Sequence, residues 1–210
     1  MLSTKTKSLE ILYTLFSMQI TTKIQQALDV AAQCHRHHRR IGFNVPYIVH
    51  PVSVAIIVSA YTNDEDTICA ALLHDIIEDS DEYDVKSMSK DFGERVTSLV
   101  QALTEQKNSS DSLEILRQNW EFRKRQYLEG LKQAPQEALV ICAADTIHNL
   151  RSLARLRQDH GDKFFGCFGA SLDRKMGFYD KLVAHLQTSL NSPIVAELTS
   201  TFEDTRKVLI

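Results

Sequence analysis

Residues 68–79 read Ile-Cys-Ala-Ala-Leu-Leu-His-Asp-Ile-Ile-Glu-Asp, and this stretch is the strongest guide to the fold. Its first six residues are all apolar, which is typical of a helix buried on every side in the centre of a domain. Four ionisable side chains follow, namely His74, Asp75, Glu78 and Asp79. Charged groups are buried only when they are paired or bound to a metal. The sequence therefore predicts a central helix that carries charge into the core.

A second apolar run has the same character. Residues 138–144 read Ala-Leu-Val-Ile-Cys-Ala-Ala and lead into Asp145, His148 and Asn149. Elsewhere apolar residues recur at helical spacing. The chain has only 7 Gly and 4 Pro in 210 residues, which is little turn chemistry for an all-β protein. We therefore expect an all-α fold, with one domain over residues 1–210.

The periodicity and the capping residues also predict where the helices lie. An N-terminal helix is expected within 1–20 and a C-terminal helix within 190–210. A helix capped by Asn63 or Asp64 should run through about Asp79, and Asp84 should cap the next one. Another helix should begin near residue 49 or 50. The helix capped by Asp84 should end near residue 93, and a further short helix should end at residue 104. The remaining helices are expected over about 21–38, 112–133, 135–157 and 171–190.

Composition and charge narrow the class of protein. The formal net charge of −3 gives no general attraction for nucleic acid or an acidic membrane. No apolar run approaches the roughly 20 residues that span a bilayer. The N-terminal stretch vaguely resembles a signal peptide, but Glu10 and Gln19 border it and no Ala-x-Ala cleavage site follows. The four cysteines form no Cys-x-x-Cys pair, which is typical of a reduced protein, so we expect a cytoplasmic location.

The acidic end of the first run needs an opposing positive charge. Asp75, Glu78 and Asp79 crowd together at helical spacing where the helix dipole is already negative. No Lys or Arg occurs between Tyr61 and Asp84, so the charge must come from elsewhere in the fold or from a divalent metal. A solvated acidic face is the alternative interpretation.

The types of the neighbouring residues favour a bound metal over a solvated acidic face. His74 and Asp75 are adjacent, and His50 and Asp145 could supply a third and a fourth ligand. Two imidazoles with carboxylates suit Mn²⁺, Fe²⁺ or Zn²⁺ better than Ca²⁺ or Mg²⁺. Such a metal lowers the pKa of bound water, and Glu78 and Asp79 could orient that water or pass its proton.

Three blocks of sequence resemble the RelA/SpoT-type hydrolase domain of the HD superfamily. They read Pro-Tyr-Ile-Val-His-Pro-Val-Ser-Val-Ala (46–55), Ala-Ala-Leu-Leu-His-Asp-Ile-Ile-Glu-Asp-Ser (70–80) and Ala-Asp-Thr-Ile-His-Asn-Leu-Arg-Ser-Leu (144–153). The resemblance covers about residues 25–185. It implies one HD-superfamily helical domain of the small stand-alone form, similar to the metazoan SpoT homologue.

The resemblance also implies roles for individual residues. His50, His74, Asp75 and Asp145 would be the ligands of a single Mn²⁺, and Glu78 with Asp79 would match the pair that activates water. The residues expected to contact a nucleotide substrate are Arg39, Arg40, Tyr47, Asn149 and Ser152. The two arginines belong to a basic stretch, residues 35–40, which is otherwise interpreted as a solvated helix end.

The expected activity is removal of the 3′-pyrophosphate from guanosine 3′,5′-bis(diphosphate) or its pentaphosphate relative. Three departures bear on the substrate: the loop 41–45, Thr146 where a Lys or Arg is usual, and the segment 105–135. An HD phosphatase acting on another phosphate compound such as NADPH is one alternative. A nucleotide-binding protein without catalysis is another, and an oligomer is compatible with the sequence.

Overall fold

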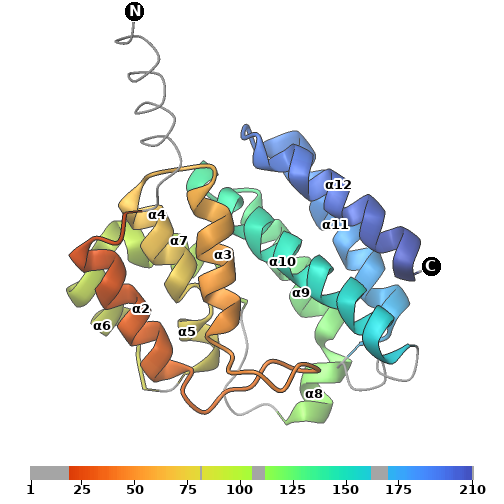
Figure 1. Cartoon of the computed structure of the whole chain (residues 1–210), viewed down its shortest axis with the longest axis horizontal. Helices are drawn as coiled ribbons and strands as arrows, with labels where there is room; N and C mark the ends of the chain where they lie inside the picture. Colours follow the sequence, from red (N-terminus) through yellow and green to blue (C-terminus); the bar gives the residue numbers. More distant parts are fainter. Residues whose placement is uncertain (1–18, 81, 106–111, 162–169, 210) are drawn as a thin grey trace, which may run out of the picture.

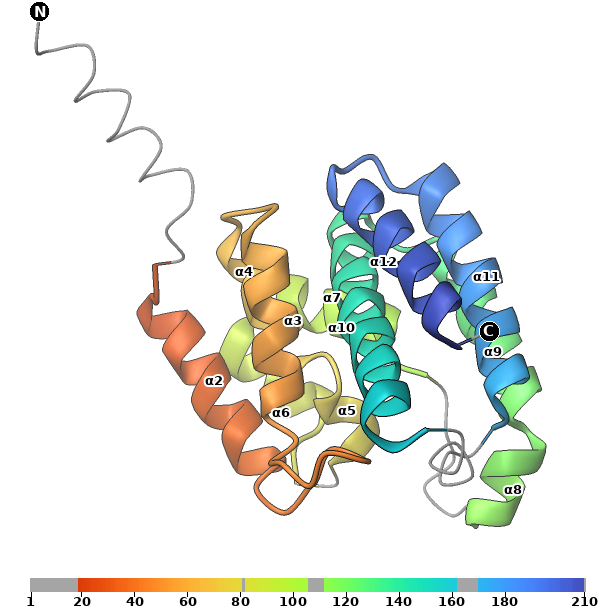
Figure 2. The ribbon, with the colours of Figure 1, turned by 45° about the vertical axis from the view of Figure 1, so that its right-hand side comes forward.

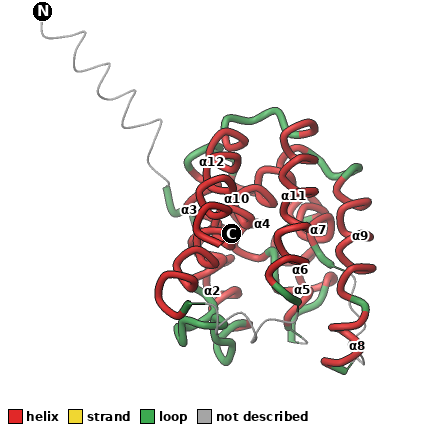
Figure 3. The backbone as a smooth tube through the Cα atoms, turned by 90° about the vertical axis from the view of Figure 1, so that its right-hand side faces the viewer, coloured by secondary structure: helices red, strands yellow, loops and turns green. Residues whose placement is uncertain are grey.

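The computed structural model describes residues 19–80, 82–105, 112–161 and 170–209, except the side chains of residues 113 and 116. The described residues form helices joined by loops, with one isolated β-bridge between Arg39 and Pro46 (Figure 3). The helices are α2 (Thr22–Cys34), α3 (Val49–Ser59), α4 (Glu65–Leu73), α5 (Ile76–Asp79), α6 (Val85–Phe92), α7 (Glu94–Leu103), α8 (Leu113–Gln118), α9 (Trp120–Leu131), α10 (Gln136–His160), α11 (Leu172–Ser189) and α12 (Ile194–Leu209). The all-α prediction is confirmed.

Helix α10 lies between two groups of helices (Figures 1 and 2). It packs against α3, α4 and α7 on one side and against α11 and α12 on the other. Both apolar runs are central, as predicted: α4 is buried from Thr67 to Leu73, and residues 138, 139 and 141–144 of α10 are buried. The single-domain assignment over 1–210 stays a prediction.

Local sequence explains where several helices begin. The Asp64 carboxylate accepts from the Thr67 N–H at the start of α4, and Asp84 accepts from the Ser87 N–H at the start of α6, as predicted. Between α6 and α7 the chain reverses at Gly93, whose φ of 87° favours glycine. No described helix is both long enough and apolar enough to cross a membrane.

The helix predicted from Asn63 or Asp64 through about Asp79 is interrupted, and forms the two helices α4 and α5. The chain leaves the helix at His74 and Asp75 before α5 begins. The His74 Nδ1 lies 2.8 Å from the Ala71 carbonyl oxygen, which the Asp75 N–H would bond in a continuous helix. The ring therefore takes the acceptor that the next turn would need.

Two further helix predictions need correction. The helix expected to reach residue 38 ends at Cys34, because His35 turns inward and packs against Tyr47 with ring centroids 4.8 Å apart. The helix expected over 112–133 is divided at Asn119, a residue type that favours helix ends. The helix expected within 1–20 lies outside the described residues up to position 18.

Candidate metal centre

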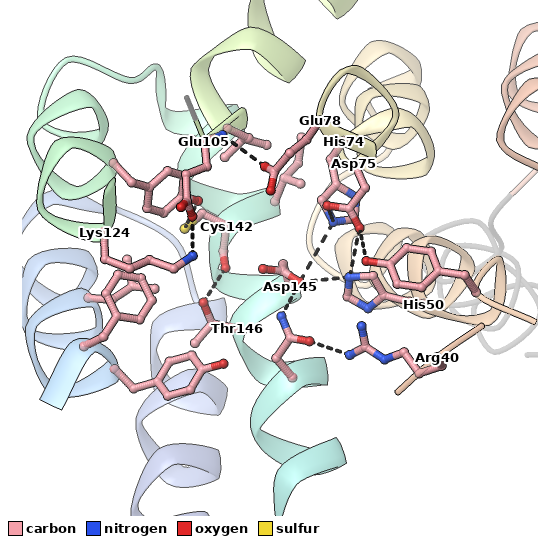
Figure 4. Close-up of a pocket in the computed structure, with 18 residues that line it drawn as sticks. Arg40, His50, His74, Asp75, Glu78, Glu105, Lys124, Cys142, Asp145 and Thr146 are labelled. Carbon is pink, nitrogen blue, oxygen red and sulfur yellow. Dashed lines mark hydrogen bonds and ion pairs between the residues drawn. The ribbon is translucent and has the colours of Figure 1, made fainter. Parts of the chain in front are cut away.

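Three of the four predicted metal ligands converge on one point. His50, His74 and Asp145 each offer a ligand atom, and these atoms all lie within 4.8 Å of one another. His50 comes from the first turn of α3, His74 from the end of α4 and Asp145 from the middle of α10 (Figure 4). Asp75 lies beside both rings, with its oxygens 3.4 Å from the His50 Nε2 and 3.3 Å from the His74 Nε2.

The two imidazoles turn the same nitrogen towards this point. The Nε2 of His50 lies 3.1 Å from the Asp145 Oδ1, and that of His74 lies 3.9 Å from the same oxygen. The His74 Nε2 is buried without a hydrogen-bond partner, while its Nδ1 donates to the Ala71 carbonyl. A neutral ring with an outward Nδ1–H has its Nε2 lone pair free for a metal. The donor set and this buried nitrogen fit a divalent cation.

The carboxylates of the group favour their charged form. Burial works to raise the pKa of Asp75, but the electrostatic interaction with the nearby His74 ring and a hydrogen bond from His50 outweigh it and hold this pKa well below its ordinary value. Burial likewise opposes ionisation of Asp145, and the His50 hydrogen bond lowers its pKa nonetheless. Burial would lower the pKa of His50, and the hydrogen bonds to Asp145 and Asp75 raise it instead. The group therefore holds ionised carboxylates without a metal.

The predicted acid/base pair divides between two neighbouring cavities. Glu78 lines the same cavity as the three converging ligands, which has a volume of about 250 Å³. Its Oε2 accepts a hydrogen bond from the backbone N–H of Glu105 at 3.1 Å. Asp79 is exposed and lines an adjoining cavity of about 340 Å³. Arg40, Tyr47 and Asn149 line both cavities, so the two form one continuous surface.

Arg40 is the predicted arginine that lines both cavities. Its guanidinium donates to the Asn149 Oδ1 at 2.5 Å, and the Asn149 Nδ2 donates to the Asp145 Oδ1 at 2.6 Å. Arg39 is exposed, donates to the Asn44 carbonyl and lines neither cavity. One predicted arginine is therefore connected through Asn149 to the metal group, defined as His50, His74, Asp75 and Asp145. The other predicted arginine lines neither cavity.

Tyr47 lines both cavities, and Ser152 lines the adjoining one. The Tyr47 hydroxyl donates to the Asp75 Oδ2 at 2.7 Å. Burial and the nearby carboxylate raise the pKa of Tyr47, so the phenol stays protonated and keeps donating. Ser152 lines the adjoining cavity, and its hydroxyl donates to the His148 carbonyl at 2.8 Å.

Sequence reasoning missed a second cation in the cavity that the candidate metal ligands line. Lys124 of α9 lines it, across from Arg40 (Figure 4). Its ammonium pairs with Glu105, a buried carboxylate that also receives Arg123. Thr146 places no charge beside Asp145, and Lys124 brings a positive charge into the same cavity. No sequence pattern indicated that Lys124 would line this cavity, because its position depends on how α9 packs against α10.

A third cation was also missed. Lys175 of α11 lines the adjoining cavity with Tyr179 and the apolar residues Phe43, Leu153 and Leu156. Burial lowers the pKa of Lys175 to about 8, so its charge is partly lost just above neutral pH. One cavity therefore carries the metal group, and the other combines apolar walls with a weakly basic lysine.

The sequence of the chain matches a known family. Residues 27–164 match the model of the HD domain. The chain belongs to the HD-domain family. Its HD domain is 33% identical over 141 residues to a GTP pyrophosphokinase of Streptomyces coelicolor, covering 67% of this chain and 16% of that protein. It is 34% identical over 139 residues to the bifunctional (p)ppGpp synthase/hydrolase SpoT of Escherichia coli, covering 65% of this chain and 19% of that protein.

The chain thus spans less than a fifth of the length of these two relatives. A solved structure also matches this chain over most of its length. It belongs to a metazoan orthologue of SpoT that hydrolyses ppGpp, with a TM-score of 0.71 and 27% identity. The match covers 92% of this chain and 100% of that one. The predicted fold class and the predicted family resemblance are both confirmed.

Proposed function

We propose that this chain is a divalent-metal-dependent phosphohydrolase that removes the 3′-pyrophosphate of guanosine 3′,5′-bis(diphosphate) or its pentaphosphate relative. The observation that supports this most is the convergence of His50, His74 and Asp145 in a cavity that Arg40 and Glu78 also line. The names of the relatives support the same substrate class. We propose Asp75 as the fourth ligand and Mn²⁺ as the metal.

A bound divalent cation would lower the pKa of a coordinated water and withdraw charge from a phosphoryl oxygen. The protein side chains would supply the remaining chemistry. Glu78, fixed by the Glu105 N–H, and Asp79 would take up and pass the proton of the attacking water. Arg40 and Lys124 would bind phosphate oxygens from opposite sides of the cavity.

The adjoining cavity would hold the nucleoside. Its apolar walls suit a base, and Asn149 and Ser152 offer polar contacts at its border with the metal group. We also propose a cytoplasmic location, because Cys34, Cys69 and Cys142 are free thiols. For Arg39 we propose only a general electrostatic attraction for anions, since its side chain lines neither cavity.

The decisive experiment measures product release by the purified protein with Mn²⁺. Guanosine 3′,5′-bis(diphosphate), NADPH and guanosine monophosphate are supplied separately, and pyrophosphate and orthophosphate are assayed in parallel. We expect GDP and pyrophosphate from the first substrate. Orthophosphate from NADPH alone would instead identify a phosphatase, and no turnover of any of the three with Mn²⁺, Mg²⁺ or Zn²⁺ would refute the enzymatic proposal.

An active-site variant separates catalysis from binding. Asp79→Asn should lose turnover while its metal content stays that of the wild type, because Asp79 is not among the converging ligands. Asp173→Asn is a matched control, since Asp173 is an exposed carboxylate at the start of α11. A fully active Asp79→Asn protein would remove the acid/base role of this residue.

A further inference from the structure

His148 lies directly behind the metal group. It follows Asp145 by three residues on α10, so its side chain lies on the same face of that helix. Its Nδ1 is 2.8 Å from the Nδ1 of His50, and the two ring centroids are 4.9 Å apart. One of these nitrogens must carry a hydrogen and the other must accept it.

The position of the other His50 nitrogen decides which one donates. The His50 Nε2 faces Asp145 and Asp75, so a metal held there needs the Nε2 lone pair. The remaining hydrogen of a neutral ring then sits on Nδ1 and points at His148. His74 follows the same rule, since its Nδ1 donates to the Ala71 carbonyl and its Nε2 faces the group.

We propose that His148 is a positioning residue that accepts the Nδ1–H of His50 and thereby holds the His50 Nε2 lone pair towards the metal. The inference rests on the proposed metal-dependent function. His148 must be neutral and protonated on Nε2, because a protonated ring would present a second donor to His50. Acceptors of this kind orient metal-bound histidines and typically change metal affinity 10- to 100-fold.

This arrangement gives α10 two functions at the metal. The helix supplies Asp145 as a ligand and His148 as the support of a ligand that comes from α3. The His148 backbone is itself fixed, since its carbonyl accepts from the Ser152 hydroxyl at 2.8 Å. The packing of α3 on α10 is thereby linked to the geometry of the metal group.

Mn²⁺ affinity, measured by calorimetry without any substrate, tests the proposal. His148→Leu should weaken binding about 10- to 100-fold, because the leucine has no acceptor. His148→Asn should bind nearly as tightly as the wild type, since the asparagine oxygen can occupy the place of Nδ1. His160→Leu, at the end of the same helix, is the matched control and should bind as the wild type does. Thermal unfolding of each variant without metal verifies that it folds.

The outcomes separate this inference from the proposed function. Equal, tight Mn²⁺ binding by the wild type and His148→Leu would overturn only the role of His148. Equally weak binding by His148→Asn and His148→Leu would do the same, because packing rather than an acceptor would then matter. A wild type that binds no divalent ion would overturn both. Imidazole ¹⁵N spectra of the protein loaded with diamagnetic Zn²⁺ provide an independent test: a proton on the His148 Nδ1 in that state would also overturn the inference.

Discussion

Glu105 gives the sharpest stability prediction, because it is a buried carboxylate with two cationic partners. Its side chain is 5% exposed and accepts from Arg123, which is 11% exposed, and from Lys124, which is 27% exposed. Glu105→Gln keeps the shape of the side chain and removes its charge. Breaking a buried ion pair by removing one partner costs about 3–5 kcal/mol. Since Lys124 retains some contact with water, we expect the lower end, about 3 kcal/mol.

Urea unfolding followed by circular dichroism measures this loss. The midpoint should fall while the slope of the free energy with urea stays unchanged, as for a change in stability alone. For a domain of this size, 1 kcal/mol shifts the melting temperature by about 2–4 °C, so we expect a decrease of about 6–12 °C. The Glu105 N–H remains available to Glu78, and metal affinity should therefore change much less than stability does.

Glu129→Gln is the matched control, because it removes the same charge from a solvent-exposed ion pair. Glu129 also pairs with a lysine, Lys132, but the two side chains are 57% and 53% exposed. Exposed pairs contribute about 0–1 kcal/mol, so this variant should unfold close to the wild-type midpoint. If Glu105→Gln and Glu129→Gln lose the same small amount, the buried charge cluster does not stabilise the fold as we argue.

Three further predictions concern the site. Arg40→Ala should raise KM for a phosphorylated nucleotide about tenfold or more, since a hydrogen bond to a charged group contributes about 1.5–3 kcal/mol. Arg39→Ala should leave KM close to the wild-type value, and similar effects of both variants would contradict the assignment of Arg40 as the substrate contact. KM should rise as pH increases through the Lys175 pKa of about 8, because the ammonium loses its charge there, and Lys175→Arg should flatten this part of the pH profile. Mn²⁺ at 100 times its Kd should raise the free energy of unfolding by about 2.7 kcal/mol over protein in EDTA, and an unchanged melting temperature would argue against a bound ion.

Much of the fold followed from local pattern. The two apolar runs predicted α4 and the first half of α10 as central helices, because only a fully buried helix tolerates apolar side chains on every face. Asp64 and Asp84 marked helix starts through their capping chemistry. The break between α4 and α5 after Leu73 could not be predicted in this way, since residues 70–79 contain neither Gly nor Pro. It depends on a side chain that bonds the backbone.

The candidate site divides in a similar way. His50, His74, Asp75 and Asp145 were recognisable because residue type and order carry the information. His148 offered a weaker sign, its spacing of three from Asp145 on a predicted helix. Lys124 and Lys175 gave none, since exposed lysines are ordinary in amphipathic helices and only the packing of α9 and α11 brings these two to the cavities.

The charges that line the metal cavity link metal binding to substrate binding. Asp75, Glu78, Glu105 and Asp145 are four carboxylates that line the cavity, against Arg40 and Lys124 of the lining and Arg123, which also pairs with Glu105. When the histidines are neutral, as metal ligands must be, one negative charge is left. A cavity of that charge repels a polyphosphate. One divalent cation more than removes this charge, and Arg40 and Lys124 then attract the substrate. The carboxylates that bind the metal would thus also make nucleotide binding depend on it, which favours metal binding before substrate.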